Sequence, residues 1–230
     1  MTEPLIIALD GPSGSGKSSV SRAVARALGI GYLDTGAMYR ALTLWCERQG
    51  IDLGDRDAVA EAAQTLPLAL GADPDAPSVE LDGEDVAGPI RTSAISALVS
   101  QVATNTAVRA ILQAQQRELM DLIAADTGGV VAEGRDITTV VAPDALVRIL
   151  LTASEDARLA RRSTELHGRA DAATMASTRD IVVRRDRDDS TVSQFTTAAE
   201  DVITVDTSDL NFEQSVAAVL DVVRAVSGPR

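Results

Sequence analysis

The fold of this chain is decided by residues 5–28, LIIALDGPSGSGKSSVSRAVARAL. The apolar run Leu5–Asp10 predicts a β-strand, and apolar residues at helical spacing in Ser18–Leu28 predict a helix. The glycine-rich residues 11–18 between them fit G-x-x-x-x-G-K-[ST], a phosphate-binding pattern that requires this strand–loop–helix context. The stretch therefore predicts the first half of a βαβ unit, and with it a parallel α/β sheet.

The loop predicts a site for the phosphates of ATP or GTP. Main-chain N–H groups of such a loop converge on phosphate oxygens, and the helix that follows adds the positive end of its dipole. Lys17, the chain's only lysine, is expected to reach the β- and γ-phosphates, and the Ser18 hydroxyl is expected to ligate Mg²⁺. The residues expected to hold ATP are Gly11, Pro12, Ser13, Gly14, Ser15, Gly16, Lys17, Ser18 and Ser19.

Strand and helix patterns alternate along most of the remaining chain. The other expected strands are Tyr32–Leu33, Gly129–Glu133, Val147–Thr152 and Val202–Asp206, and the other expected helices are Ala37–Arg48, Asp55–Thr65, Ser93–Ala124, Asp156–Leu166, Thr174–Arg187 and Phe212–Val226. From Leu66 to Ile90, glycine and proline separate brief apolar runs, which predicts a β-rich insert. We expect one α/β domain, residues 1–230, with a five-stranded parallel sheet flanked by helices and an insert at about residues 66–97.

Composition and charge exclude several classes of function. The 230 residues are 45% hydrophobic, enough for one substantial core, and their net charge of −13 repels nucleic acid. One cysteine, Cys46, and one histidine, His167, provide neither a disulfide nor a Cys/His metal cluster. No run approaches the roughly 18 apolar residues of a membrane span, and no signal peptide is expected. We expect a cytoplasmic protein that binds neither membranes nor nucleic acid.

The arginines indicate phosphoryl transfer without a general base. Such transfer is catalysed mainly by positioning and by cations around the phosphoryl oxygens. If the acceptor is a phosphate monoester, its attacking oxygen is already anionic, and bidentate arginines can hold it. The candidates are Arg40, Arg109 and Arg135, then Arg158, Arg161 and Arg162 on one expected helix, and Arg184, Arg185 and Arg187 on another.

Six segments in series resemble the bacterial cytidylate (CMP) kinases. They are residues 11–19 (GPSGSGKSS), 33–40 (LDTGAMYR), 83–91 (GEDVAGPIR), 100–103 (SQVA), 133–141 (EGRDITTVV) and 185–191 (RDRDDST). The resemblance runs from Leu5 to about Ser208. It implies a P-loop nucleoside-monophosphate kinase of pyrimidine metabolism, a monomer that transfers the γ-phosphoryl group of ATP, with Mg²⁺, directly to CMP or dCMP.

The resemblance also implies a role for each matching residue. Arg40, Arg135 and Arg185 would hold the acceptor phosphate with Thr35, Asp189 would hold the ribose, and Ser100, Arg109 and Asp136 would read cytosine. Residues 66–97 would form the CMP-binding insert, and residues 156–170 a lid whose arginines, Arg162 among them, fold onto the donor phosphates. With Lys17, the arginines Arg40, Arg135, Arg162 and Arg185 would be the catalytic residues.

Cytosine chemistry agrees with this base-reading set. The N4 amine of cytosine can donate to a carboxylate, and its O2 and N3 can accept from arginine and serine. Uracil reverses the pattern at N3 and at position 4. A buried polar group left unpaired by the wrong base costs about 1–3 kcal/mol, roughly tenfold or more in discrimination.

Two positions depart from the pattern of that family. Val192 follows Asp189-Ser190-Thr191 where the family carries a ribose-contacting arginine, and we expect this loss to weaken acceptor binding. Arg184 and Arg187 are candidates to substitute for it. Thr138 stands where the family carries glycine, so the backbone there is expected to differ.

Three other functions remain open from the sequence alone. One is a P-loop kinase for a different acceptor, such as UMP, a deoxynucleoside, shikimate or gluconate. Another is a nucleotide-binding regulator that no longer transfers phosphate. The third is a structural α/β protein that retains a phosphate-binding loop.

Overall fold

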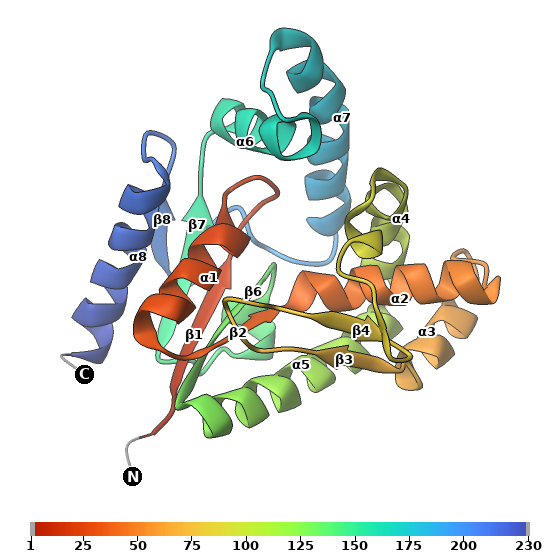
Figure 1. Cartoon of the computed structure of the whole chain (residues 1–230), viewed down its shortest axis with the longest axis horizontal. Helices are drawn as coiled ribbons and strands as arrows, with labels where there is room; N and C mark the ends of the chain where they lie inside the picture. Colours follow the sequence, from red (N-terminus) through yellow and green to blue (C-terminus); the bar gives the residue numbers. More distant parts are fainter. Residues whose placement is uncertain (1–2, 229–230) are drawn as a thin grey trace.

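The main sheet, in a computed structural model that describes residues 3–228, has five parallel strands in the order β2–β6–β1–β7–β8 (Figure 1). The strands are β1 Leu5–Asp10, β2 Gly31–Asp34, β6 Gly129–Gly134, β7 Val147–Thr152 and β8 Ile203–Asp206. The predicted five-stranded parallel sheet is confirmed. All five strands end at one edge, where ligands of open α/β sheets bind.

Helices cover both faces of this sheet. Because a strand has a period of two, Ile7 of β1 packs toward helices α1 (Lys17–Leu28) and α8 (Phe212–Ser227), and Ala8 packs toward α5 (Thr106–Thr127). Both faces are therefore apolar. This explains why the central strands are continuous apolar runs in the sequence.

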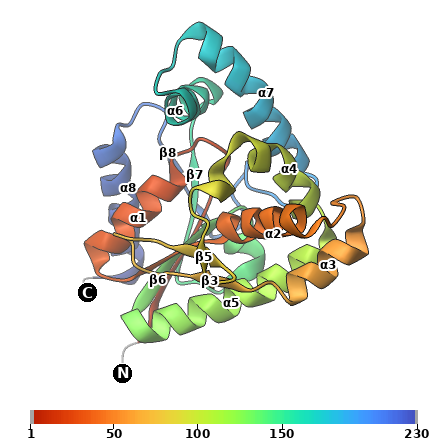
Figure 2. The same ribbon diagram turned by 45° about the vertical axis from the view of Figure 1, so that its right-hand side comes forward.

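A second, smaller sheet packs beside the first on helix α2 (Thr35–Gln49) (Figure 2). Its strands are antiparallel: β3 Leu68–Leu70, β4 Val79–Leu81 and β5 Glu84–Asp85. Val79 and Leu81 cover Ala37 and Ala41 of α2. A 3₁₀ turn, Pro89–Arg91, leads from it into α4 (Ser93–Ala103), which packs with α2, α3 (Arg56–Gln64) and α5 around a separate core.

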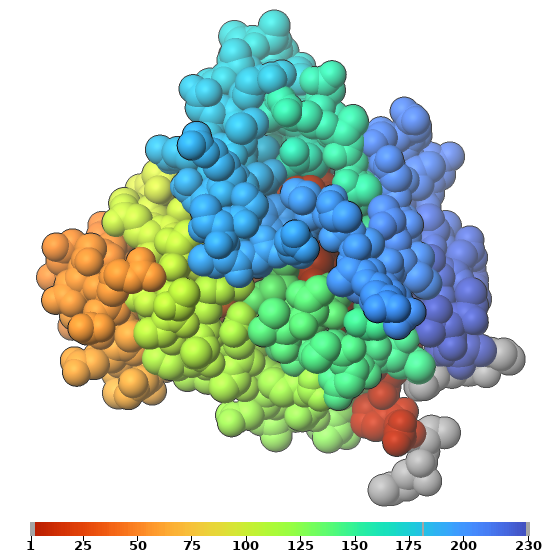
Figure 3. Space-filling model, turned by 180° about the vertical axis from the view of Figure 1, so that it is seen from behind, coloured from red at the N-terminus to blue at the C-terminus, as the bar shows by residue number. Residues whose placement is uncertain are grey.

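Helices α6 (Glu155–His167) and α7 (Ala172–Asp189) pack together beyond the carboxyl ends of the strands (Figure 1). Gly168, with φ of 70°, ends α6 in the left-handed conformation. Seen from behind, the blue segment that follows α7 crosses the middle of the molecule, with red N-terminal atoms visible in the gaps beside it (Figure 3).

The predicted single helix Ser93–Ala124 is wrong. The structure has two helices, α4 and α5, bent by 100° to each other. Asn105 caps α5 by accepting hydrogen bonds from the N–H groups of Ala107 at 3.1 Å and Val108 at 3.4 Å. Apolar spacing continues on both sides of the break, so periodicity alone does not reveal it, whereas an asparagine cap is a recognisable signal.

Within residues 3–228, no single helix is both long enough and apolar enough to cross a membrane. The bent pair α4 and α5 meets both conditions only when the two helices are taken together.

Candidate active site

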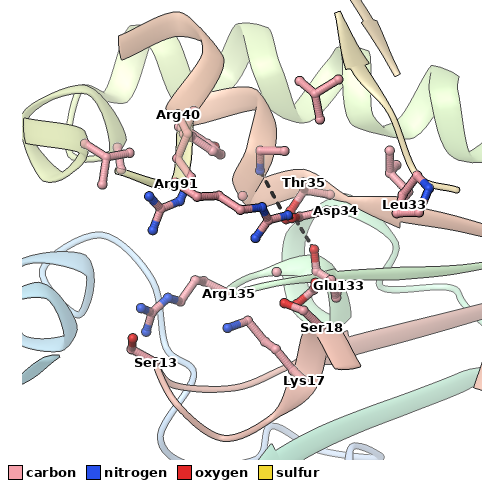
Figure 4. A pocket seen from close by; sticks show the side chains of 18 of the residues that line it. Ser13, Lys17, Ser18, Leu33, Asp34, Thr35, Arg40, Arg91, Glu133 and Arg135 are labelled. Carbon is pink, nitrogen blue, oxygen red and sulfur yellow. Dashed lines mark hydrogen bonds and ion pairs between the residues drawn. The ribbon is translucent and has the colours of Figure 1, made fainter. Parts of the chain in front are cut away.

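A cavity of about 510 Å³ lies at the carboxyl ends of β1, β2 and β6, and α6 and α7 each contribute to its wall. Of the residues predicted to bind nucleotides, it is lined by Ser13, Gly14, Gly16, Lys17, Ser18, Ser19, Thr35, Arg40, Arg109, Arg135, Asp136, Arg162, Arg185 and Asp189. Gly11, Pro12, Ser15 and Ser100 are not among its lining residues. Most residues expected on the donor side and on the acceptor side therefore face one space (Figure 4).

Two different structural constraints require glycine in the phosphate loop. Gly14 and Gly16 have φ of 77° and 87°, in the left-handed region that a side chain disfavours. A Cβ at Gly11 would lie 2.3 Å from the main-chain oxygen of Leu151, so Gly11 lets the loop pack against β7. With Gly16 as its cap, α1 has no capping side chain, and its first N–H groups and positive dipole end are available to an anion.

Lys17 projects from the loop toward Arg135, with Ser18 and Glu133 nearby (Figure 4). Burial lowers the pKa of Lys17 to about 8, an effect that Glu133 opposes and that Arg135 and Arg185 reinforce. An anion bound in the cavity would favour the charged ammonium and raise this pKa again.

A buried carboxylate, Glu133, faces the Ser18 hydroxyl. Glu133 is 1% exposed and accepts a hydrogen bond of 2.7 Å from the Tyr32 hydroxyl. Burial and the nearby Asp34 raise the pKa of Glu133, while Lys17 and the hydroxyls of Ser18 and Tyr32 lower it. The residues that the structure describes contain no group of three or more His, Cys, Asp or Glu side chains placed to hold a metal. Protein oxygens could thus supply only part of a cation's coordination shell.

Buried arginines crowd the acceptor end. Arg40 is 7% exposed and donates to the Ser96 hydroxyl at 2.9 Å. Burial, together with the charges of Arg185 and Arg162, lowers the pKa of Arg40 to about 9. Burial also lowers the pKa of Arg185 to about 10, with the charge of Arg135 next in importance. Guanidiniums that destabilise one another in this way form a site for a multiply charged anion.

Arg135 is fixed from three sides. Its Nη1 donates to Asp186 Oδ1 at 2.8 Å, and its Nη2 lies 3.1 Å from Asp189 Oδ2. Its guanidinium carbon lies 4.1 Å from the centre of the Phe195 ring, which is itself buried. A guanidinium stacked on a ring and paired with two carboxylates loses little further freedom when it holds a phosphate.

The predicted base-reading residues fall into two groups. Arg109 and Asp136 form a buried ion pair that lines the cavity, and Gln113 donates to the same Oδ2 of Asp136 at 2.6 Å. Ser100 is half-buried on α4, and its carbonyl accepts from the Thr104 hydroxyl at 2.7 Å. The structure thus brings two of the three residues to the cavity, and a cytosine-reading role for Ser100 stays a prediction.

Thr35 lines the cavity, but its hydroxyl is already used as a donor. It donates to the main-chain oxygen of Glu133 at 2.7 Å. Only its oxygen lone pairs and the start of helix α2 are then available to a ligand.

Thr138, the first departure from the family pattern, lies in a π-helical turn, Ile137–Val141, that sequence periodicity did not predict. Its N–H and hydroxyl donate to Asp10 Oδ2 at 2.8 and 2.6 Å, and Ile137 N–H donates to Asp10 Oδ1 at 2.9 Å. Burial raises the pKa of Asp10 to about 6 despite these bonds. Thr138 has no positive φ, and its hydroxyl adds a hydrogen bond to Asp10 that glycine could not make. The expected difference of the backbone from that of the family stays a prediction.

The three lid arginines differ in their contacts. Arg158 Nη1 donates to the Ser13 carbonyl at 2.9 Å and Arg161 Nη1 to the Ser15 carbonyl at 3.1 Å, so both tie α6 to the loop backbone. Arg162 alone of the three lines the cavity. Contact of the lid arginines with the donor phosphates stays a prediction, which the position of Arg162 favours most directly.

The two candidate substitutes for the ribose arginine lie outside the cavity lining. Arg184 and Arg187 are exposed, and neither lines the cavity. Their positions on α7 place them one residue before Arg185 and two after it, on other faces of the helix.

Sequence reasoning missed four charged residues around this cavity. Asp34 and Arg91 pair at 2.9 Å and both line it, as does Glu133, while Asp186 pairs with Arg135 beside it. Asp34 and Glu133 are the last or nearly last residues of β2 and β6, and a carboxylate at such a strand end is the signal that could have found them. All four residues lie within quoted motif segments, so only their roles were missed.

Comparison with known proteins identifies relatives over the whole length of the chain. The family model described as "Cytidylate kinase" matches residues 7–225. A cytidylate kinase of Streptomyces griseus is 46% identical over 95% of this chain and 92% of its own. Cytidylate kinases of Cutibacterium acnes and Rhodococcus opacus are 51% and 50% identical, over 96% and 99% of this chain and 97% and 98% of theirs.

Solved structures with a similar course of the chain include a shikimate kinase from Acinetobacter baumannii in complex with shikimate. It is 16% identical, covers 98% of this chain and 94% of its own, and has a TM-score of 0.40. A similarity at this score carries no argument about what this chain binds.

Proposed function

Because the chain belongs to the cytidylate kinase family, we propose that the cavity at the sheet edge binds ATP at the phosphate loop and CMP or dCMP at the arginine cluster. The chain is an enzyme, a nucleoside-monophosphate kinase that phosphorylates CMP with ATP. The observation that carries the assignment of the site is that Lys17, Arg40, Arg135 and Arg185 line one cavity. Donor and acceptor phosphates held there can react directly.

The donor half consists of the loop and its helix. The N–H groups of residue 14 and residues 16–18 would bind the phosphates, and Lys17 would neutralise charge on the β- and γ-phosphates. The family requires a metal ion with its nucleotide, and we propose Mg²⁺. The Ser18 hydroxyl, with Glu133 beside it, would hold the ion, because Mg²⁺ in such sites takes one or two protein oxygens and completes its shell with phosphates and water. When bound, such an ion would supply positive charge that stabilises the phosphoryl oxygens.

The acceptor half needs no proton-abstracting residue. A CMP phosphate is an anion, and its oxygen can attack the γ-phosphorus in line with the leaving ADP oxygen. Arg40, Arg135 and Arg185 would hold this phosphate, with Thr35 at the start of α2. Arg162 on α6 would stabilise the charge of the transferred group. The lowered pKa values of Arg40 and Arg185 support this proposal, because their crowded charges are relieved by an anion.

The base would be read by Asp136, Arg109 and Ser100, and the ribose held by Asp189. The two donors on Asp136 Oδ2 leave its Oδ1 to accept from the cytosine N4 amine. The small sheet, within residues 66–97, would border the acceptor nucleotide, because Leu70, Val79 and Arg91 of this region line the cavity. Residues 156–170 would act as the lid.

An ADP-release assay over a panel of nucleoside monophosphates tests this assignment. We expect CMP and dCMP to be phosphorylated far faster than UMP or AMP. Equal rates with CMP and UMP would refute the base-reading proposal. A Lys17→Met variant that keeps wild-type turnover and remains folded would refute the donor site.

We also propose that the protein is a cytoplasmic monomer that does not bind nucleic acid. The acidic net charge of −13 supports the last point, because it disfavours a polyanionic partner. Light scattering after gel filtration is expected to give the mass of one chain, 24.0 kDa. A mass of twice that value would refute the monomer.

A further inference from the structure

Asp186 on α7 connects the donor loop, the acceptor arginine and the lid. Its Oδ1 accepts from the Ser13 N–H at 3.1 Å and from Arg135 Nη1 at 2.8 Å, and its Oδ2 accepts from Arg158. These groups come from three segments far apart in the sequence. Ser13 and Arg135 line the cavity, whereas Asp186 is not among its lining residues. The Asp186 carboxylate therefore lies outside the cavity lining and holds two lining residues, Ser13 and Arg135, in place.

The Ser13 peptide is held at both ends by this arrangement. Arg158 donates to the Ser13 carbonyl at 2.9 Å and to Asp186, which in turn accepts from the Ser13 N–H. The helix backbone is also close here, because a Cβ on Gly14 would lie 2.5 Å from the main-chain oxygen of Arg158. The loop at residues 13 and 14 is thus clamped by α6 and α7 together.

The charges favour this clamp strongly. Burial by itself raises the pKa of Asp186, but the charge of Arg135 and the hydrogen bonds from Arg135, Ser13 and Arg158 outweigh it and lower the pKa. The Asp186 side chain is 13% exposed, as is that of Arg135. Hydrogen bonds between charged groups that are largely shielded from water are among the stronger contacts in a protein. They keep the loop and the guanidinium at a fixed separation.

We propose that Asp186 is a positioning residue for phosphoryl transfer, which holds the Ser13 peptide and the Arg135 guanidinium in register across the cavity. The proposal rests on the proposed function, in which Ser13 belongs to the donor loop and Arg135 holds the acceptor phosphate. In-line transfer is sensitive to this register, because a misplacement of about 1 Å can cost on the order of 100-fold in rate. The alternative is that the carboxylate competes with nucleotide phosphates for Ser13 and Arg135.

The kinetic test compares Asp186→Asn with Asp180→Asn. Asp180 is exposed on the same helix, and its replacement makes the same change in net charge. For Asp186→Asn we expect kcat with CMP to fall about 10- to 100-fold, the loss of one or two hydrogen bonds to a charged group, with KM values changed less than about threefold. Asp180→Asn should match the wild type. An unchanged kcat, or a lower KM for ATP with kcat retained, would overturn the proposal, the second in favour of competition.

A second measurement does not depend on turnover. Hydrogen exchange of the peptide that covers residues 11–16, measured without added nucleotide, is expected to be faster in Asp186→Asn than in Asp180→Asn, while the melting temperature shows that the variant is folded. Unchanged exchange would overturn the clamp even if kcat fell. Faster exchange in a protein that phosphorylates none of the monophosphates would instead refute the proposed function and leave the clamp standing.

The double variant Asp186→Asn/Arg158→Met separates a shared role from two independent ones. If both side chains act on the Ser13 peptide, the loss of kcat in the double variant is smaller than the product of the two single losses. Multiplicative losses would show that Arg158 acts elsewhere and would overturn the two-helix clamp.

Discussion

Gln113 gives the sharpest test of how this site selects its base. Gln113 Nε2 donates to Asp136 Oδ2 at 2.6 Å, and Arg109 donates to the same oxygen. In Gln113→Leu the carboxylate keeps one of these two anchors and can rotate. A hydrogen bond to a charged group contributes about 1.5–3 kcal/mol. Because Arg109 remains, we take the lower end, which corresponds to about a tenfold loss.

The assay is kcat/KM for CMP and for UMP at fixed, saturating ATP. We expect the value for CMP to fall about tenfold and the value for UMP to change little, because uracil has no N4 amine to donate to Asp136. Gln115→Leu is the matched control, since residues two apart on a helix point in different directions. An unchanged ratio of CMP to UMP in a folded Gln113→Leu protein would refute the reasoning. Equal losses with both bases would show that the change had distorted the whole site.

Three further predictions follow from single side chains. Because the lowered pKa of Lys17, about 8, means that its ammonium loses its proton as pH rises, kcat/KM for ATP should fall above about pH 8. The kcat at saturating ATP should hold to higher pH, since bound phosphate raises that pKa, and identical pH profiles for the two constants would contradict this. Thr138→Gly removes the hydrogen bond from the Thr138 hydroxyl to Asp10 and raises the conformational entropy of the unfolded chain. The free energy of unfolding should therefore fall by about 1–2 kcal/mol, and an unchanged melting temperature would count against this prediction. Val192→Arg restores a guanidinium beside the ribose site and should lower the KM for CMP and dCMP, whereas unchanged constants would show that residue 192 does not face the acceptor.

Much of the fold was predictable because it depends on local pattern. The strand–loop–helix at residues 5–28 and the five apolar strands follow from periodicity and from one motif. The break at Asn105 and the π-turn at Ile137–Val141 were not predicted, for different reasons. Asn105 carries a cap signal that periodicity obscures, whereas the π-turn is held by Asp10, over 120 residues away in the sequence.

The site shows the same division between local and distant causes. The gathering of Lys17, Arg40, Arg135 and Arg185 at one cavity was predictable from residue type and motif position, because each lies in a segment that matches a phosphate-binding pattern or the family. The roles of Arg158 and Arg161 were not, because a long guanidinium side chain reaches either a ligand or a nearby carbonyl. Their choice depends on the close approach of α6 to the loop, which only the structure shows.

The segment after Thr191, which departs from the family pattern at Val192, contributes a buried aromatic ring, Phe195, to the site. The segment that lacks the family arginine at Val192 buries a phenylalanine three residues later, 1% exposed, with the Arg135 guanidinium 4.1 Å above its ring. A cation over a ring that is shielded from water is stabilised by about 2 kcal/mol. The segment therefore supports a cation already in the cavity and adds none of its own. That contact joins Arg135 to Phe195, which lie far apart in the sequence, so no local pattern could predict it. It makes the orientation of Arg135 depend on the irregular segment that follows α7.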